Sequence, residues 1–287
     1  MVPVNTDDYK GIGGLWRLAR MLRRDYDINA VADLHGVLRS RVIGLAMRLH
    51  GIAVARIVKG RAEKRALTAG KIHRQLATSH DRYRDVFHRL GLDSEDDFTT
   101  IFADGDAPPF GAFPAKEPGE KRVAVAPFSQ HVGKVYPLEL TEQVVEQLSR
   151  LPGVKVLLFG GGEQEKKLLL PLATRYEGVV SIAHLKHRLE DELSLMATCD
   201  AMVTMDSANM HIASLVGLPA VSVWGATHPY CGFMGWRQSL DNAVQLDMEC
   251  RPCSVFGNRP CRFGDYRCMR RIAPETIVEK VKRLIGI

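Results

Sequence analysis

Polar residues that directly follow an apolar run form the part of this sequence best suited to chemistry. The run from Ala201 to Met205 predicts a buried strand, and Asp206, Ser207 and a helical pattern that begins at Asn209 follow it. Such a strand, turn and helix N-terminus gather free backbone N–H groups and the positive end of the helix dipole. We therefore expect this junction to hold an anionic group such as a diphosphate, which is typical of a nucleotide-sugar site.

Three side chains of this region each have a chemical and a structural interpretation. Lys134 follows a glycine just after a predicted strand, so its ammonium would reach phosphate oxygens unless it is an ordinary surface lysine. Asp206 would accept hydrogen bonds from sugar hydroxyls, order the loop or cap the helix. His211 lies one turn inside the helix and would donate to a phosphate, unless it is a buried structural histidine.

The elements that position these residues alternate along the second half of the chain. Apolar runs predict strands at Val123 to Pro127, Val154 to Phe159, Val179 to Ile182, Ala201 to Met205 and Ala220 to Trp224. Helical patterns separate them at Leu138 to Arg150, Glu163 to Tyr176, Glu190 to Cys199 and Asn209 to Val216. This α/β alternation is typical of a parallel sheet with helices on both faces, and ligands are then expected at the carboxyl ends of the strands.

The first half of the chain has a different character. It is rich in helical patterns, at Gly14 to Arg24 and Arg39 to His50, around one clear strand at Ala30 to Asp33. Prolines and glycines between Ala107 and Gly119 place a linker near residues 105–121. We therefore predict two domains, residues 1–117 and 118–287, of which the first looks incomplete as a doubly wound sheet.

Length and charge bound the function further. At 287 residues, with 46% hydrophobic and 25% charged residues, the chain is long enough for two domains with cores of their own. The net charge of +6 is uneven, because residues 39–92 hold thirteen Lys and Arg against three acids, whereas residues 93–120 hold eight acids and one Lys. This pattern suits an anionic partner, such as phosphorylated lipid or nucleic acid, or only a solvated surface. No apolar run has the length of a membrane helix, and the start lacks a signal-peptide pattern, so we expect a cytoplasmic protein.

Four motifs lie in order along the second half: Pro127-Phe128-Ser129 with Lys134-Val135-Tyr136-Pro137, Phe159-Gly160-Gly161-Gly162-Glu163, Asp206 to Ala213, and Trp224 to Pro229. In order and spacing they resemble the bacterial heptosyltransferases of glycosyltransferase family nine. Weaker likeness at Asp33 to Ser40 and at Asp81 to Arg84 extends the resemblance over most of the chain.

The resemblance implies a GT-B architecture, with two Rossmann-like domains facing each other across a cleft. It implies that residues 118–287 bind an ADP-heptose donor, and that residues 1–117 form the acceptor-side domain for the lipopolysaccharide core at the inner membrane face. The family inverts the anomeric centre without a catalytic metal, so neutralising the leaving diphosphate would pass to Lys134, Ser129 and backbone N–H groups after Asp206. The implied donor-binding residues are Ser129, Lys134, Gly160, Glu163, Asp206, Ser207, Ala208, Asn209, His211 and Thr227, and the acceptor-side residues are Arg39 and Arg82.

The sequence departs from the family's pattern in two places. Ala208 stands where family members usually have Gly, and its methyl group narrows the approach of the backbone to a phosphate. Relatives normally begin with a strand and a Gly-Asp loop whose aspartate is the general base, and we find no such loop here. We expect either a truncated chain or a divergent member, in which Asp33 is only a fallback base.

The C-terminal region adds a cysteine cluster and a last helix. Of the six cysteines, Cys250, Cys253, Cys261 and Cys268 follow a spacing that would close a structural zinc site on an irregular loop, or they are reduced structural thiols. No cofactor is implied for catalysis. The helix predicted at Pro274 to Ile285 either packs back across the domain interface or caps the second domain.

Two functions explain the motifs, and a third explains less. The chain is a glycosyltransferase that transfers heptose or a related sugar from an ADP-sugar to a lipopolysaccharide core acceptor, or it is a nucleotide-sugar-binding protein without transferase activity. A zinc-containing nucleic-acid binder would leave the motifs unexplained and lacks an aromatic-rich basic stripe, so we predict no nucleic-acid partner. A nicotinamide-dependent oxidoreductase is disfavoured, because Gly160-Gly161-Gly162 lacks the GxGxxG spacing.

Overall fold

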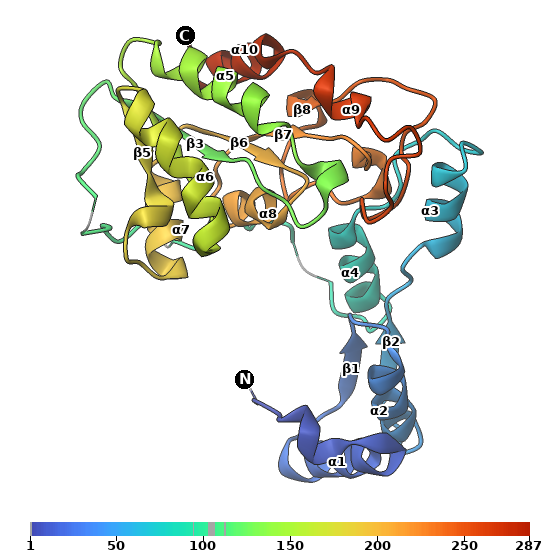
Figure 1. Cartoon of the computed structure of the whole chain (residues 1–287). Helices are drawn as coiled ribbons and strands as arrows, with labels where there is room; N and C mark the ends of the chain where they lie inside the picture. Colours follow the sequence, from blue (N-terminus) through green and yellow to red (C-terminus); the bar gives the residue numbers. More distant parts are fainter. Residues whose placement is uncertain (1, 94, 103–106, 112) are drawn as a thin grey trace. The chain divides into compact units, whose positions relative to one another are not determined.

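The chain folds into two compact units. The computed structural model describes residues 2–93, 95–102, 107–111 and 113–287 (Figure 1). The first unit runs to Ala62 and resumes at Ala77–Asp96, and the second unit comprises Glu63–Leu76 and Asp97–Ile287. This division differs from the predicted boundary at residues 117 and 118. Residues 105, 106 and 112 of the predicted linker lie outside the described residues.

The second unit takes in more of the chain because apolar residues before the predicted boundary join its core. Phe102, Phe110 and Phe113 pack against the cluster formed by the sheet and its helices, and the Ile101 backbone N–H donates to the Leu215 carbonyl at 2.8 Å. Leu67 and Leu76, in the earlier segment Glu63–Leu76 of this unit, are buried together with Cys231. A linker expected from its Pro and Gly content is therefore anchored by its aromatic side chains.

The first unit is built around two strands, not one. Its elements are η1 (Thr6–Tyr9), α1 (Gly11–Asp25), β1 (Ala30–Asp33), α2 (Leu38–Arg48), β2 (Ala53–Arg56) and α4 (Ser79–His88). β1 and β2 pair in parallel, with Ala30 opposite Ala53 and Asp33 opposite Arg56. The small core is Ala19, Ala46 and Met47, with partly buried apolar side chains around it. The prediction of one clear strand was wrong, because β2, which has the same Ala-Val-Ala start as β1, also pairs into this sheet.

The second unit contains a six-stranded parallel sheet. Its strands are β3 (Lys121–Ala126), β4 (Val154–Leu158), β5 (Val179–Ser181), β6 (Ala201–Met205), β7 (Ala220–Val223) and β8 (Ala243–Val244), in the order β5-β4-β3-β6-β7-β8. Its α-helices are α5 (Leu138–Ser149), α6 (Gly162–Arg175), α7 (Leu189–Ala197), α8 (Ala208–Leu215), α9 (Arg267–Arg270) and α10 (Pro274–Ile285), and it also holds most of α3 (Arg61–Thr68). The short 3-10 helices are η3 (Val132–Lys134), η4 (Ile182–His184), η5 (Pro229–Cys231) and η6 (Leu240–Asn242).

Helices cover both faces of this sheet, which explains why its strands are apolar throughout. On β3, Val123 and Val125 point into the core made with α5, α6 and α10, whereas Ala124 and Ala126 point into the core made with α7 and α8. Successive side chains of a strand face opposite sides, so both sets are buried. α10 packs against α5, as Figure 1 shows. This agrees with the prediction that the last helix caps the second domain.

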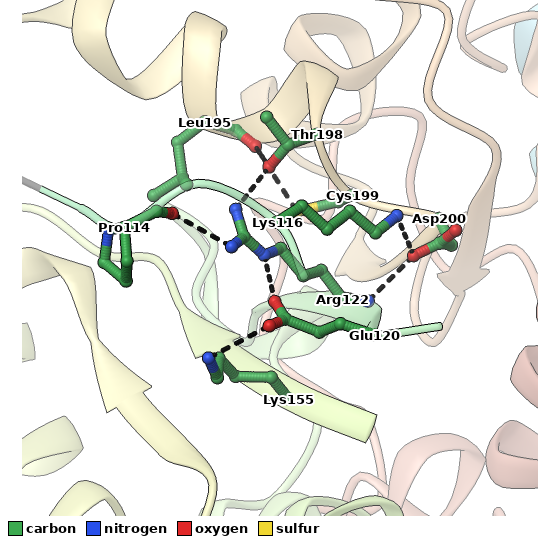
Figure 2. A network of polar contacts seen from close by, with 9 residues as sticks. All are labelled: Pro114, Lys116, Glu120, Arg122, Lys155, Leu195, Thr198, Cys199 and Asp200. Carbon is green, nitrogen blue, oxygen red and sulfur yellow. Dashed lines mark hydrogen bonds and ion pairs between the residues drawn. The ribbon is translucent and has the colours of Figure 1, made fainter. Parts of the chain in front are cut away.

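A buried ion network lies at the amino end of β3 (Figure 2). The guanidinium of Arg122, whose side chain is 1% exposed, pairs with Glu120 and donates to the Thr198 hydroxyl at 3.0 Å and the Pro114 carbonyl at 3.0 Å. Lys155 also bonds to Glu120, at 3.2 Å. This network fixes the segment before β3 to the second unit.

Among the described residues, no helix combines the length and apolar character needed to cross a membrane.

Candidate functional site

The candidate site lies where the chain reverses its direction across the sheet. β3 and β6 are neighbours, but from β3 the chain proceeds outward to β4 and β5, and from β6 it proceeds to β7 and β8 on the other side. In an open parallel sheet this reversal opens a crevice at the carboxyl ends of the two strands. A cavity of about 590 Å³ lies there, with Ser129 after β3 and Asp206 after β6 among its lining residues.

Most of the predicted donor-binding residues line this cavity. Eight of the ten do so: Ser129, Lys134, Gly160, Asp206, Ser207, Ala208, Asn209 and His211. They come from the loops after β3, β4 and β6 and from the start of α8. Residues as far apart in sequence as Ser129 and His211 are thus brought together by the parallel strands.

Lys134 and Asp206 form the charged centre of the site. The Lys134 Nζ lies 3.1 Å from the Asp206 Oδ2, and the two side chains are only 15% and 7% exposed. The hydroxyl of Thr227, which is fully buried, donates to the same Oδ2 at 2.8 Å. Lys134 is therefore held in place rather than being an ordinary surface lysine, and an ammonium has three donors, so it can bind an anion while it remains paired.

The start of α8 supplies further positive potential. Ser207 is its N-cap and makes no capping bond with its side chain; its hydroxyl lies 3.2 Å from that of Thr204. The first N–H groups of a helix have no partner within it and attract anions. The Ser129 hydroxyl donates to the Asp206 carbonyl at 3.2 Å, so it orders the turn that leads into this helix. The interpretation of Asp206 as the helix cap is wrong, because Ser207 takes that place.

His211 lies on α8 and faces the cavity with an exposed side chain, so it is not a buried structural histidine. The protein around the ring displaces enough water to lower the pKa of His211; the Asp206 carboxylate opposes this shift and Lys134 reinforces it. The ring is therefore neutral near pH 7, where it carries one N–H donor.

Two predicted donor-binding residues do not line the cavity. Glu163 is 81% exposed at its side chain and pairs with Lys166 at 3.1 Å on the surface of α6. Glu165 lines the cavity in its place, because its carboxylate turns back to accept the Gly161 N–H at 2.7 Å. Thr227 lies behind the lining, where it holds Asp206.

Nine lining residues were not predicted: Phe128, Gln130, Phe159, Gly161, Glu165, Glu192, Phe233, Val255 and Phe256. Phe128, Gln130, Phe159 and Gly161 lie beside predicted residues at strand ends, and that position is a usable signal. Phe233, Val255 and Phe256 come from irregular loops far along the chain, for which the sequence gives no periodic pattern.

The loop that carries Val255 and Phe256 is anchored by Arg251. This guanidinium, in a residue only 8% exposed, donates to the carbonyl oxygens of Trp224 at 3.1 Å and Thr227 at 2.9 Å. The Cys253 N–H donates to the Ala226 carbonyl at 2.9 Å. The loop is therefore attached to the carboxyl end of β7 and forms one wall of the cavity.

The predicted residues of the first unit have structural contacts. Asp33 accepts the Gly36 N–H at 2.7 Å and Arg56 Nε at 2.9 Å, and its side chain is 2% exposed. Burial alone would raise the pKa of Asp33, but these hydrogen bonds outweigh it and lower the pKa, which makes Asp33 a weak base. Arg82 is buried and donates to the Val58 carbonyl at 2.9 Å, whereas Arg39 is exposed at the start of α2. The acceptor-side roles of Arg39 and Arg82 both stay predictions.

The structure gives the predicted zinc site no support. Among the described residues, which include all six cysteines, no three His, Cys, Asp or Glu side chains are grouped so as to hold a metal ion. The Cys253 thiol instead donates to the Cys250 carbonyl at 3.1 Å. Cys261 accepts backbone N–H groups of residues 263–266, and Cys268 is buried. The thiols of Cys253 and Cys261 therefore have local partners within the loop.

Comparisons with known proteins agree with this geometry. Residues 15–266 match the sequence profile described as glycosyltransferase family 9 (heptosyltransferase). Lipooligosaccharide heptosyltransferase 2 of Campylobacter jejuni is 27% identical over 133 residues, which cover 45% of this chain and 41% of that protein. The chain therefore matches less than half the length of this curated relative.

Solved structures share the fold. The glycosyl transferase family 9 structure from Veillonella parvula superposes with a TM-score of 0.69 at 18% identity, covering 99% of this chain and 82% of that one. The E. coli heptosyltransferase WaaC with ADP superposes with a TM-score of 0.57 at 16% identity, covering 94% and 77%. The predicted α/β fold of GT-B type is confirmed, whereas the predicted cleft between the two units stays a prediction.

Proposed function

We propose that this chain, which belongs to glycosyltransferase family 9, the heptosyltransferase family, binds an ADP-sugar and transfers its heptose or a related sugar to a lipopolysaccharide core acceptor. The observation that carries the proposal is the convergence of Lys134, the Ser129 hydroxyl and the N-terminus of α8 on one cavity at the point where the sheet reverses. A cavity of about 590 Å³ is in the range that holds a small-molecule ligand.

The diphosphate is the part of the donor that these groups recognise. A leaving nucleoside diphosphate carries negative charge that grows in the transition state, and fixed donors stabilise it most where water is excluded. Lys134 supplies a full positive charge, and the helix N-terminus supplies N–H groups and a partial charge. We propose that these groups stabilise the leaving diphosphate without a catalytic metal and that the transfer inverts the anomeric centre.

The acceptor is proposed from charge and family. The basic stretch at residues 39–92 suits the phosphorylated sugars and lipid of a lipopolysaccharide core. E. coli WaaC has been solved with ADP and with ADP-2-deoxy-2-fluoro heptose, which supports an ADP-heptose donor here. We propose that transfer takes place at the cytoplasmic face of the inner membrane, with the protein in peripheral contact.

One observation favours a second function, nucleotide-sugar binding without transfer. Asp33, the fallback base, is engaged by the Gly36 N–H and by Arg56, and the pKa of its carboxyl is lowered. A carboxylate so placed is a poor acceptor for the proton of an incoming hydroxyl. Binding and transfer must therefore be measured separately.

The test compares ADP-dependent stabilisation in three proteins. ADP at 100 times its dissociation constant stabilises a folded protein by about 2.7 kcal/mol, so a clear rise in melting temperature is expected for the wild type. Lys134→Ala should lose most of this rise. Lys166→Ala removes a lysine that pairs with Glu163 on the surface and should keep it.

Transfer is then assayed with ADP-heptose and a heptose-deficient lipopolysaccharide, with and without EDTA, and the anomer of the product is determined by NMR. Equal ADP stabilisation of wild type and Lys134→Ala would refute the assigned site. Stabilisation without product would establish the second function.

A further inference from the structure

We infer that Gly257, in the loop between Cys250 and Cys268, is a positioning residue for the donor diphosphate: it leaves the space in which the side chain of Lys134 lies. The inference rests on the proposed function, because it assigns Lys134 to the diphosphate. It adds to that function a loop far along the sequence whose backbone determines where the phosphate-binding ammonium sits.

Gly257 lies directly over the aliphatic part of Lys134. A Cβ atom built on Gly257 would stand 2.5 Å from the Lys134 Cδ and 2.6 Å from its Cγ, where ordinary contact begins at 3.4 Å. These carbons are in the middle of a side chain whose Nζ is tied to Asp206 at 3.1 Å. A methyl group at this position would therefore displace Lys134 by about 0.9 Å or break its pairing with Asp206.

The loop cannot easily move away instead. The Gly257 N–H donates to the Ser254 hydroxyl at 2.7 Å, and Ser254 is only 4% exposed. Arg251 and Cys253 fix the preceding residues to the carbonyl groups after β7. The Phe256 ring lies against Phe233, with 5.6 Å between ring centroids, and both line the cavity. The position of Gly257 is thus fixed by the residues that precede it in the loop.

A second glycine of the same loop provides a matched control. Gly257 has φ +75° and Gly264 has φ +77°, so an alanine would meet the same left-handed backbone strain at either position. A Cβ on Gly264 would have nothing within 4 Å. The two substitutions therefore differ in the contact with Lys134 and not in backbone conformation.

The experiment measures ADP affinity by calorimetry in wild type, Gly257→Ala, Gly264→Ala, Lys134→Ala and the double variant Gly257→Ala/Lys134→Ala. Because a misplacement of 1 Å costs up to about 100-fold at a catalytic site, we expect about tenfold weaker ADP binding for Gly257→Ala. Gly264→Ala should bind ADP as the wild type does. In the Lys134→Ala background, Gly257→Ala should have no further effect, since the displaced side chain is gone.

The wild type and the same four variants are compared by urea unfolding, which needs no ligand. Gly257→Ala should be less stable than Gly264→Ala, and the excess loss should vanish in the Lys134→Ala background, even if Gly257→Ala alone folds poorly. Equal ADP affinities of the two glycine variants, or an undiminished effect of Gly257→Ala without Lys134, would overturn the inference while the proposed function stands. Failure of the wild type to bind ADP would overturn both.

Discussion

Replacing Arg122 with Met should destabilise the second unit strongly, although Arg122 lies at the end of the sheet opposite the site. The substitution keeps the apolar part of the side chain and removes the guanidinium that pairs with Glu120, Thr198 and the Pro114 carbonyl (Figure 2). The Glu120 side chain is 9% exposed and would keep only Lys155, at 3.2 Å. Removing one partner of a buried ion pair costs about 3–5 kcal/mol, and the remaining bond to Lys155 places the expected loss near 3 kcal/mol at pH 7.

The pH dependence of the stability loss in Arg122→Met gives an independent test. Burial alone would raise the pKa of Glu120, but the bonds from Arg122 and Lys155 outweigh it and lower the pKa. In the wild type the ionised Glu120 therefore contributes stability above its unfolded pKa of about 4.3, and this contribution is lost as the pH falls below that value. In Arg122→Met the burial dominates, so the deficit relative to wild type should shrink as the pH falls toward 4.

The assay is urea unfolding followed by tryptophan fluorescence. In a Trp16→Phe background, the remaining tryptophans, Trp224 and Trp236, both belong to the second unit and report on it. Arg150→Met is the control, because Arg150 is 73% exposed and pairs with Glu146 on α5. Such surface pairs contribute about 0.3–0.5 kcal/mol.

Adding Glu120→Gln to Arg122→Met removes the buried carboxylate that has lost its main partner and should recover part of the loss. A deficit no larger than that of the control, or no recovery with Glu120→Gln, would refute the reasoning.

Two further predictions concern titratable groups of the second unit. Burial lowers the pKa of His228 to about 4, with Arg251 and His73 adding to the shift, so stability should fall as the pH drops from about 6.5, the pKa of an unfolded histidine, to 4. His228→Asn keeps an acceptor for the Tyr230 N–H and should remove this part of the acid dependence in urea unfolding; an unchanged dependence would contradict the assignment. Burial raises the pKa of Cys199 to about 12 and that of Cys268 to about 11, whereas at Cys261 the bonds from backbone N–H groups outweigh burial and lower the pKa. Iodoacetamide at pH 8 should therefore label Cys261 before Cys199 and Cys268 by mass spectrometry, and early labelling of Cys199 would show that its environment is different.

The sequence predicted five of the six strands of the second sheet, and missed the two-residue β8, because of where these strands lie. Strands buried on both faces are apolar throughout, so the predictions at Ala201–Met205 and the neighbouring runs agree with the structure to within a residue or two. β2 is short and half exposed, and its register is set by pairing with β1, which no local pattern reveals. α4 does carry a local signal in the sequence, the capping box of Thr78 and Asp81.

The candidate site divides in the same way. Residues that directly follow a strand, such as Ser129 and Asp206, are placed by the strand itself, so their position could be predicted. Glu165 lines the cavity and Glu163 does not. Which of the two faces the cavity depends on the rotation of the first turn of α6, and an apolar pattern does not reveal that rotation. Phe256 reaches the cavity through a loop that contacts of Arg251 hold in place, and Phe233 packs beside the buried Leu67, Leu76 and Cys231. Such residues cannot be identified from the order of the chain alone.

The charge balance of the site explains why so many groups surround one lysine. Burying the Lys134 ammonium without a partner would be costly, and Asp206 offsets that cost in the absence of an anion. The same carboxylate repels an incoming diphosphate, so attraction must come from donors that Asp206 does not occupy. Thr227 donates to the Oδ2 that Lys134 also contacts, and so draws part of its negative charge away from the cavity. In the proposed complex, the first N–H groups of α8 and the remaining Lys134 donors would face the anion together, and the Gly257 backbone would keep the lysine where both sets of donors meet.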